Sequence, residues 1–259
     1  MKSNLAMEQS KGVGGGIADD PGMNAFALSV LRVMDNIEYR LCEDGEDMED
    51  IYRLRYNSYL KGGMIASDAS RVVVDEFDGQ PNAYLYGVYY DGHLVSTVRL
   101  SHVTPEFPKS PSVKVFGDVL EPRLAAGESF IDPSRFASDG EWSATLRVLP
   151  YITLRLALIS TYFFEPTSCL TAVKEDHAAF YRRMFLAKPL VRARAYPGLI
   201  RPVDLWESKY PECADQGARR FAFFRSSALE RRMLFTKPIQ GHRAPLTILP
   251  STKFLNNAA

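Results

Sequence analysis

The clearest structural signal in the chain reads Asn82-Ala-Tyr-Leu-Tyr-Gly-Val-Tyr-Tyr90, then Asp91-Gly92, then His93-Leu-Val-Ser-Thr-Val-Arg-Leu100. The two longer runs are rich in β-branched and aromatic residues, which favour β-strands. The Asp-Gly pair between them suits a tight type I′ turn, because glycine readily adopts a positive φ angle. This segment therefore predicts a β-hairpin.

Helical and extended patterns surround the hairpin. On its N-terminal side, apolar positions from Asp47 to Leu60 recur at helical spacing. On its C-terminal side the patterns predict a strand at 128–136, a long helix at 143–164, a strand at 168–173, a helix at 176–185 and an amphipathic helix at 217–234. The economical arrangement is an α/β (α+β) fold with a mixed central sheet flanked by helices.

Composition divides the chain into three parts. The first residues are polar and Gly-rich, and no sustained apolar pattern begins before Phe26. We therefore expect residues 1–36 to be a mobile N-terminal tail. We expect residues 37–196 to form the core domain, with residues 197–259 as a C-terminal extension packed on it.

Composition also excludes several classes of protein. Of the 259 residues, 46% are apolar, which is enough to bury one large core. The 31 basic residues balance 31 acidic ones, whereas a nucleic-acid-binding protein needs a cationic excess. Three widely separated cysteines fit neither a disulfide framework nor a zinc site, so no metal is expected. With no secretory segment and no apolar run long enough to span a bilayer, we expect a cytoplasmic protein.

Charged residues occur where a folded core would normally hold apolar ones. Arg55 lies on the apolar-rich helix, Arg99 lies within the second hairpin strand, and Asp75 and Asp78 follow a Val triplet. The run Asp132-Pro-Ser134-Arg135-Phe136 interrupts a predicted strand. Buried charges are costly unless they pair with one another. Either each of these residues lies on a solvated surface, or the arginines and aspartates meet in one site.

These residues resemble a known family. The runs Arg55-x-x-x-Tyr59, Asp75-x-x-Asp78, Val98-Arg99-Leu100 and Asp132-x-Ser134-Arg135-Phe136 follow one another as in the acyl-homoserine lactone (autoinducer) synthases. They are more similar still to the long-chain N-acyl amino acid synthases of the FeeM type, to which Phe180-Tyr-Arg-Arg183 is also similar. Both groups have the GNAT-like acyltransferase fold. The resemblance covers about Ile51 to Pro189, and it implies that residues 37–196 are a GNAT-like catalytic domain.

The chain departs from the autoinducer synthases in two places. Those enzymes usually carry Glu at the positions of Val73 and Asp132. The first departure disfavours an enzyme that binds S-adenosylmethionine and favours a different amine acceptor. The coenzyme A loop of small acetyltransferases is also missing before the helix predicted at 143–164. The resemblance therefore implies an acyl donor carried by acyl carrier protein rather than acetyl-coenzyme A.

The implied reaction moves a fatty acyl group from a thioester to the α-amine of an amino acid. Because an ammonium ion must lose a proton before it attacks, Asp132 is the candidate base. Ser134 and Arg135 are catalytic candidates beside it, with backbone N–H groups after Ser134 stabilising the oxyanion. The substrate-binding candidates are Arg55, Asp75, Asp78, Arg99 and Phe136, with the arginines suited to a carboxylate and the aspartates orienting them or holding the ammonium. No cofactor is required, since acyl carrier protein thioester or acyl-coenzyme A serves as co-substrate.

Several alternatives remain open. His102 or His177 could be the base, since histidine titrates near neutral pH. Asp132 could instead be a structural partner of Arg135 or Arg99. The protein could also be an autoinducer synthase, or a catalytically silent protein that binds an acyl chain or acyl carrier protein.

Charge is segregated along the chain. Residues 35–78 contain 12 acidic and 5 basic side chains, whereas residues 177–237 contain 13 basic and 5 acidic ones. The basic region could be an ordinary solvated surface, or it could dock an acidic partner. Acyl carrier proteins are acidic as a family, so the docking candidates are Arg182, Arg183, Arg192 and Arg194.

Overall fold

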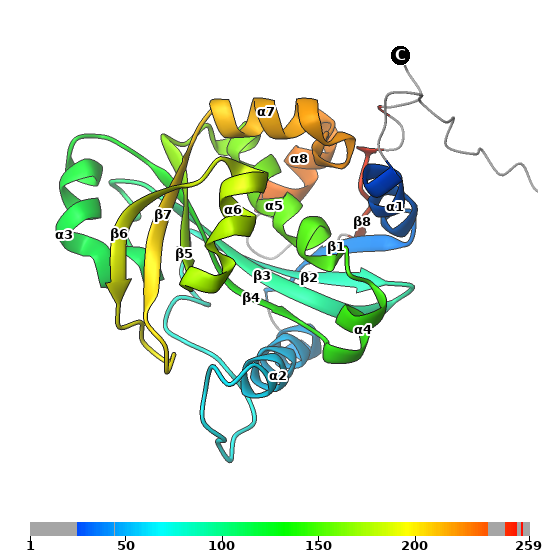
Figure 1. Cartoon of the computed structure of the whole chain (residues 1–259), viewed down its shortest axis with the longest axis horizontal. Coiled ribbons are helices and arrows are strands. Elements are labelled where there is room, and N and C mark those ends of the chain that lie inside the picture. The colour runs from blue at the N-terminus through cyan, green and yellow to red at the C-terminus, as the bar shows by residue number, and fades with distance from the viewer. Residues whose placement is uncertain (1–24, 44, 238–246, 253–254, 256–259) are drawn as a thin grey trace, which may run out of the picture.

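The computed structural model describes residues 25–43, 45–237, 247–252 and 255 (Figure 1). The helices are α1 (Ala25–Met34), α2 (Gly45–Lys61), α3 (Pro111–Ala125), α4 (Gly140–Thr145), α5 (Leu149–Phe164), α6 (Ala178–Phe185), α7 (Glu212–Arg220) and α8 (Ala228–Phe235), with short 3₁₀ turns η1 (Glu175–His177) and η2 (Ala222–Phe224). The strands are β1 (Ile37–Leu41), β2 (Ala83–Tyr90), β3 (His93–Val103), β4 (Phe130–Ser138), β5 (Ser168–Val173), β6 (Lys188–Arg194), β7 (Val203–Lys209) and β8 (Thr247–Ile248).

Eight strands form one sheet in the order β6-β7-β5-β4-β3-β2-β1-β8. The predicted hairpin is confirmed as β2 and β3, in which Tyr90 lies opposite His93. Asp91 and Gly92 turn the chain with φ angles of 48° and 80°, the left-handed region that glycine tolerates best. Within the described sheet, β4 and β5 form the parallel pair, and every other neighbouring pair runs antiparallel. The expected mixed sheet flanked by helices is therefore confirmed.

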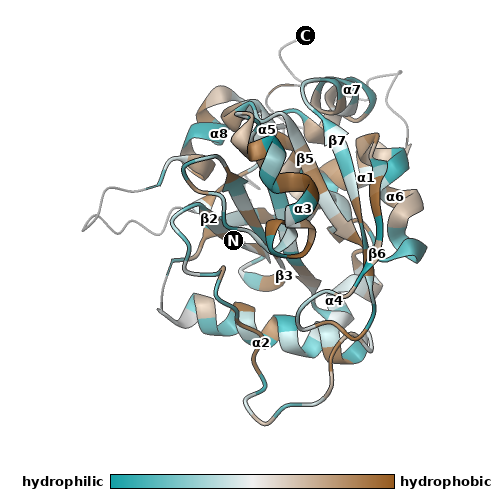
Figure 2. Ribbon diagram, turned by 90° about the vertical axis from the view of Figure 1, so that its left-hand side faces the viewer, coloured by the Kyte–Doolittle hydropathy of each residue, from teal (hydrophilic) through white to brown (hydrophobic). Residues whose placement is uncertain are grey.

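Helices cover both faces of the sheet. One face packs against α1, α5, α6 and α8 in the larger core, to which β2 contributes Tyr84, Tyr86 and Val88. The opposite face packs against α3 and α2 in two smaller cores. Alternate residues of β2 and β3 point to opposite faces, so Arg99 points to the α2 face while Val98 and Leu100 enter the larger core. Figure 2 shows hydrophobic residues along the strands between α2 and α5.

Two helices differ from their predicted bounds. The helix expected at 143–164 is divided at Leu146 into α4 and α5, because Pro150 occupies the first turn of α5, where its missing N–H costs nothing. The helix expected at 217–234 is divided into α7 and α8 by η2. The carbonyl groups of Phe223 and Arg225 in that break accept hydrogen bonds from Arg155.

The expected domain boundaries need correction. Residues 25–34 do not belong to a tail: they form α1, which buries Val30 and Leu31 against the larger core. The first 24 residues of the expected tail lie outside the described residues. The boundary expected at 196 does not separate two structural units either, because β7 lies inside the sheet between β5 and β6. Apolar helices and strands beyond 196 complete the core rather than extend it.

No helix in the described part of the chain is long and apolar enough to cross a membrane. The most apolar helix, α5, spans 16 residues and lies against the sheet with Leu149, Ile152 and Leu156 fully buried. Its apolar character is explained by burial on nearly all sides within the larger core.

Candidate active site

The strands β4 and β5 separate and leave a cavity through the sheet. They pair only at Phe130 with Ser168 and at Ile131 with Cys169, and diverge beyond those residues. A cavity of about 310 Å³, which we call the large cavity, fills the gap. Its lining comes from both faces of the sheet, with Tyr59 and Met64 near α2 and with Leu158 and Tyr181 on α5 and α6.

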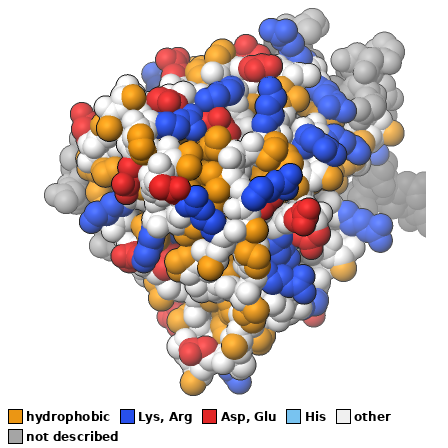
Figure 3. All heavy atoms as spheres, turned by 60° about the vertical axis from the view of Figure 1, so that its left-hand side comes forward, with side chains coloured by type: hydrophobic (Ala, Val, Ile, Leu, Met, Phe, Trp, Pro, Cys, Tyr) orange, Lys and Arg blue, Asp and Glu red, His pale blue; other side chains and the backbone are white. Residues whose placement is uncertain are grey.

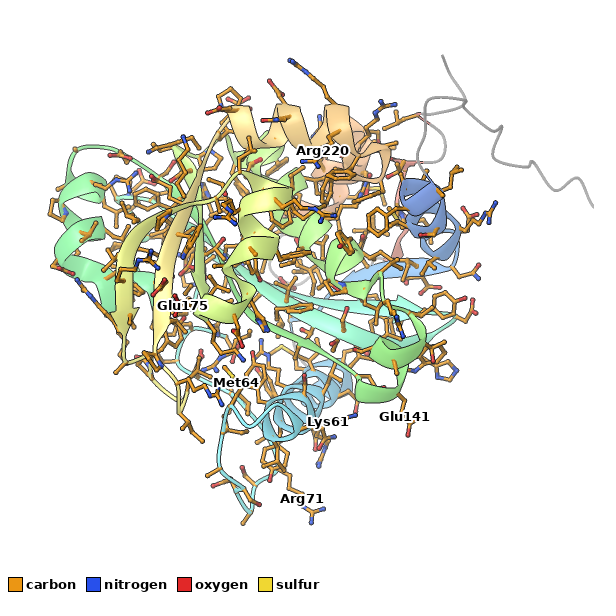
Figure 4. All side chains as sticks on the ribbon, viewed as in Figure 1. Lys61, Met64, Arg71, Glu141, Glu175 and Arg220 are labelled. Carbon is orange, nitrogen blue, oxygen red and sulfur yellow. The ribbon has the colours of Figure 1, made fainter. Side chains whose placement is uncertain are left out.

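Exposure shows which end of the large cavity opens to solvent. His177 and Gly62 in its lining are exposed, and Met64, Lys174 and Ser138 are half-buried. This open end lies between the C-terminal end of α2 and the start of α6, where Figure 4 shows Met64 and Glu175. At the other end, Leu158 and other lining residues from α5 and α7 are buried. A ligand can therefore enter at one end and bury an apolar tail at the other.

Strand β4 bulges beside the cavity. Thr97 lies opposite Ala137 and Arg99 lies opposite Ser134, so Val98 faces two residues of β4. The extra residue bends the strand and releases backbone groups from regular pairing. Arg135 has a φ angle of 55°, which costs a residue other than glycine about 1 kcal/mol. Its guanidinium is fixed by Asp75, and that contact holds the bulge.

The predicted arginines and aspartates do meet in one cluster on the α2 face of the sheet. Arg55 on α2 reaches Asp78 at 2.9 Å, and Arg99 on β3 bonds both Asp78, at 2.9 Å, and Asp75, at 2.5 Å. Arg135 donates to Asp75 Oδ2 from Nε at 2.8 Å and from Nη2 at 2.6 Å. Three guanidinium groups are therefore hydrogen-bonded to two carboxylates, which leaves one positive charge in excess.

The spacing Asp75-x-x-Asp78 has a local cause. Asp78 Oδ2 accepts the N–H of Asp75 at 3.0 Å, and Asp75 Oδ1 accepts the N–H of Phe77 at 2.9 Å. The turn fixes both carboxylates where the arginines reach them. The arginines also hold the pKa of Asp75 well below its usual range against the effect of burial. Asp75 therefore stays anionic and cannot serve as a base.

The members of this cluster differ in access. Arg55 and Arg99 are fully buried and line neither cavity, whereas Arg135 borders the large cavity. Arg99 Nε donates to Ser134 Oγ at 3.1 Å, and Ser134 and Phe136 also line the large cavity. The structure therefore places Arg135, Ser134 and Phe136 at the surface of the site, with the other two arginines behind them.

Arg55 is also incompletely paired. Its Nη1 bonds Asp78, while Nε and Nη2 have no hydrogen-bond partner in the described part of the chain. Burial lowers the pKa of this guanidinium. The cluster is thus short of acceptors as well as of negative charge.

A second, smaller cavity adjoins this cluster. It has a volume of about 150 Å³, and we call it the small cavity. Its lining is charged, with Glu76 and Lys114 paired at its edge and Asp75 and Arg135 at the cluster. Phe77, Pro111, Tyr196 and Pro197 complete the wall. Arg135 and Tyr196 line both cavities, so the two meet there.

Asp132 lies behind the wall of the site. It is fully buried and lines neither cavity. Its carboxylate accepts hydrogen bonds from the hydroxyl of Ser112 at 2.7 Å and from the N–H of Ser112 at 3.0 Å. Burial raises the pKa of its carboxyl. Burial raises the pKa of the Tyr196 hydroxyl, and the charge of Asp132 raises it further. Asp132 forms no hydrogen bond to Arg99 or Arg135.

The two histidines considered as candidate bases, His102 and His177, have different surroundings. His102 stacks on Phe164, with ring centroids 4.2 Å apart, and burial lowers its pKa. It lines neither cavity, whereas His177 lines the open end of the large cavity.

The four docking candidates differ in their ion pairing. Arg182 and Arg183 lie exposed on α6 and form no ion pair with any described carboxylate. Arg192 pairs with Asp204 at 3.0 Å, and Arg194 pairs with Asp118 of α3 at 2.5 Å. Figure 3 shows basic and acidic side chains interspersed over one side of the molecule.

Sequence reasoning missed three residues of the site. Tyr196 and Glu76 lie in loops and Lys114 lies in the first turn of α3, and neither periodicity nor buried charge marks them. The loop that carries Tyr196 is held to the loop after α2 by a hydrogen bond from Ile200 N to Met64 O at 3.0 Å. The sequence has no signal for that contact, because the two loops are more than 130 positions apart.

Comparisons with known proteins identify the family. The family model of the N-acyl amino acid synthase FeeM matches residues 50–208, more than half of the chain. The chain belongs to this family. A search of curated proteins finds no match. The solved structure of FeeM, an N-acyl amino acid synthase from uncultured soil microbes, is similar with a TM-score of 0.55 and 16% identity, covering 70% of this chain and 94% of that one.

Further solved structures are similar at lower scores. The coenzyme A-dependent acyl-homoserine lactone synthase MesI matches with a TM-score of 0.47 and 19% identity, covering 71% of this chain and 90% of that chain. The acyl-homoserine lactone synthase LasI matches with a TM-score of 0.46 and 12% identity, covering 80% and 98%. The family match and the similarity to the FeeM structure confirm the resemblance to the FeeM family and the GNAT-like fold, and the protein is an acyltransferase.

Proposed function

We propose that this FeeM-family acyltransferase moves a long fatty acyl chain from acyl carrier protein to the α-amine of an amino acid. The junction of two unlike cavities at Arg135 and Tyr196 carries this proposal. The large cavity has a buried, largely apolar end that suits an acyl chain. The small cavity combines Glu76 with Lys114 and Arg135, which suits a molecule with both charges. The thioester and the amine would meet between them, at the bulge of β4.

Arg135 and Lys114 are the cations that we assign to the acceptor's carboxylate. Both line the small cavity, whereas Arg55 and Arg99 are buried behind it. A guanidinium makes forked contacts to a carboxylate. The excess positive charge of the cluster favours an anionic ligand at its open side. Arg99 and Arg55 would act on the substrate through the position of Arg135.

The reaction needs one proton acceptor and one oxyanion site. The ammonium loses a proton, the neutral amine attacks the thioester carbonyl carbon, and a C–N bond forms. The carbonyl oxygen becomes an oxyanion, which backbone N–H groups near the bulge would stabilise. The nitrogen then gives up its second proton as the C–S bond breaks, and the released thiolate takes up that proton. The product is an amide, with the free thiol left on the carrier.

Asp132 is the residue that we propose as the proton acceptor. Its carboxyl has a pKa raised by burial, which suits a base better than the lowered pKa of Asp75. Because Asp132 lies behind the wall, the proton would pass through a water molecule or the hydroxyl of Tyr196. Asp132→Asn keeps the size of the side chain but accepts no proton, so turnover should fall by about 10²–10⁴-fold with donor binding little changed. Near wild-type turnover of this variant from pH 6 to 9 would make Asp132 structural.

The start of α4 supports a carrier-protein donor over coenzyme A. That helix follows β4, where the small acetyltransferases have their coenzyme A loop. Here Asp139 Oδ1 accepts the N–H groups of Glu141, at 2.9 Å, and Trp142, at 3.0 Å. The backbone donors that could bind a phosphate are thus occupied by a carboxylate, and Glu141 adds a second negative charge.

The carrier protein must approach the open end of the large cavity. Lys174 and His177 lie there, and Arg182 and Arg183 lie farther along α6. Arg192 and Arg194 are already paired with carboxylates. We therefore expect the rate with a carrier-protein donor to fall with salt, and Lys174→Glu to reduce it more than Arg182→Glu/Arg183→Glu. Equal salt responses in wild type and both variants would remove α6 and Lys174 from the docking surface.

One experiment tests the proposed function as a whole. The purified protein is incubated with acyl carrier proteins of several chain lengths and a mixture of amino acids, and products are identified by mass spectrometry. The proposal expects N-acyl amino acids and a free carrier thiol. A lactone formed with consumption of S-adenosylmethionine would instead identify an autoinducer synthase. Tight acyl binding without turnover would identify a silent binding protein.

A further inference from the structure

The buried end of the large cavity is closed by α7. Cys213 of α7 lines the cavity and is buried, as are Leu158 and Thr161 of α5 beside it. All of α7 lies beyond residues 50–208, the part that matches the family model. This end of the cavity is therefore built by a part of the chain that the family match does not describe.

Gly217 brings α7 close to α5. It lies one turn after Cys213 on the same side of the helix, and both are buried. A Cβ atom at position 217 would lie 2.8 Å from Leu158 Cδ1 and 3.6 Å from Phe224 Cδ2. Glycine in a helix interior is unfavourable relative to alanine, so this close approach gives a packing reason for it. Tyr162 of α5 also donates to Asp215 of α7 at 3.2 Å.

We propose that α7 is the end wall of the acyl site and sets the longest acyl chain that the enzyme transfers. The inference rests on the proposed function, since it assigns the large cavity to the acyl chain. Cys213 contacts the end of the chain directly. Gly217 acts through Leu158, because it allows that side chain to lie back against α7 instead of in the cavity.

The closed end of the large cavity limits the length of acyl chain that the site can hold. Beyond the length at which the chain reaches α7, each further methylene has no room, and the rate should fall steeply.

Three variants test the end wall in both directions. Gly217→Ala displaces Leu158, and because protein interiors are close-packed, the adjoining cavity is where that side chain has room to move. Cys213→Leu fills the end directly. Both should shorten the preferred chain by about one to two carbons, with kcat/KM for the longest chains lowered about fourfold per methylene. Leu158→Val should lengthen it by about one carbon.

A double variant and a control distinguish the wall from a general disturbance. In Gly217→Ala/Leu158→Val the shortened side chain relieves the contact, so the chain-length profile should return close to that of wild type. Gln216→Ala changes an exposed residue of α7 and should leave the profile unaltered. Active variants that all share the wild-type profile would overturn the proposal.

A binding measurement separates failure of this inference from failure of the proposed function. Free fatty acids of increasing length are titrated into wild-type protein and into Cys213→Leu, and each dissociation constant is measured by calorimetry. Acids long enough to reach α7 should bind Cys213→Leu more weakly than wild type, whereas shorter acids should bind both proteins equally. A loss of affinity that does not depend on chain length would overturn the end wall. A length-dependent loss in a protein that acylates no amine would keep the wall and refute the proposed function.

Discussion

Arg155 and Arg55 are both fully buried arginines on helices, yet only Arg155 has a hydrogen-bond partner for each of its three guanidinium nitrogens. Arg155 Nε donates to Phe223 O at 2.8 Å, and its Nη1 and Nη2 reach Glu230 at 2.5 Å and 2.9 Å. Nη2 also donates to the carbonyl of Arg225 and to Thr252 Oγ1. Arg55 bonds Asp78 and leaves Nε and Nη2 without partners in the described residues.

The two surroundings differ in charge as well as in hydrogen bonding. The Arg155–Glu230 pair is neutral, and neither residue lines the large or the small cavity. The cluster around Arg55 has one guanidinium more than its carboxylates, and through Arg135 it borders both cavities. The same kind of ion pair therefore joins α5 to α8 in one region and, in the other, leaves positive charge available to a ligand. The difference shows that buried charge indicates function only where it is unbalanced and accessible.

The largest expected effect is on stability, at the buried Arg155–Glu230 pair. Glu230→Gln leaves Arg155 charged and buried without its carboxylate, which typically costs about 3–5 kcal/mol of unfolding free energy. Activity per folded molecule should be unchanged. Urea unfolding measures the loss. Glu49→Gln is the matched control, because Glu49 pairs with Arg53 in an exposed contact and should cost less than about 1 kcal/mol. Similar losses in both variants would contradict the comparison.

The next effect is on activity, at the arginine–aspartate cluster that borders the cavities. Arg135→Lys keeps the charge but not the forked contact, so kcat/KM for an amino acid should fall about 10²-fold, or roughly 2.7 kcal/mol. Unfolding free energy should change far less than in Glu230→Gln. An amino-acid amide should be a poor acceptor for wild type and lose little more in the variant. If acid and amide suffer equally, Arg135 maintains the bulge and the carboxylate contact lies at Lys114.

The third effect is on the pH dependence of stability. The pKa of Asp75 is lowered in the folded protein, so its contribution, about 2 kcal/mol for an ion-paired carboxylate, is present above about pH 4 and lost as the pH falls further. The pKa of Asp132 is raised, so its contribution is present at low pH and lost as the pH rises through the raised value. Asp75→Asn should therefore lose stability against wild type mainly above pH 4.

The opposite sign for Asp132 provides the internal control. The stability of Asp132→Asn relative to wild type should improve as the pH rises. Unfolding by urea between pH 3.5 and 8 measures both differences. Parallel pH profiles for the two variants would show that the two carboxylates have similar surroundings. That result would contradict the structure, in which Asp75 contacts arginines and Asp132 is buried against Ser112.

The sequence predicted the local parts of this fold and the composition of the charged cluster. The hairpin depends on Asp91-Gly92 and its flanking strands, so its signal is local. Arg99 and Asp75 stood out because charge in apolar surroundings needs a partner, and the structure does bring them together. Tyr196 gave no such signal, because its place beside Arg135 depends on two loops far apart in the sequence.

Long-range packing explains the remaining differences. Arg155 lies within an apolar helix, but its partner Glu230 is 75 positions away and lies on a helix whose start depends on the η2 break. The place of β7 inside the sheet likewise depends on pairing with β5 and β6, which no local pattern encodes. A sequence pattern shows that a buried charge or a strand requires a partner, whereas the identity of that partner depends on the packing of the whole fold.

The smallest expected effect concerns an exposed ion pair that lies outside the arginine–aspartate cluster. Arg194 on β6 bonds Asp118 at 2.5 Å and 2.8 Å, and both side chains are partly exposed. Because solvent and salt screen such a pair, Arg194→Gln should lower the unfolding free energy only slightly, and high salt should make that change smaller still. Urea unfolding at low and high salt measures it. Kinetics separate this structural role from docking: if Arg194→Gln lowers kcat/KM with a carrier-protein donor but not with a small pantetheine thioester, Arg194 contacts the carrier, and its pairing with Asp118 must open when the donor binds.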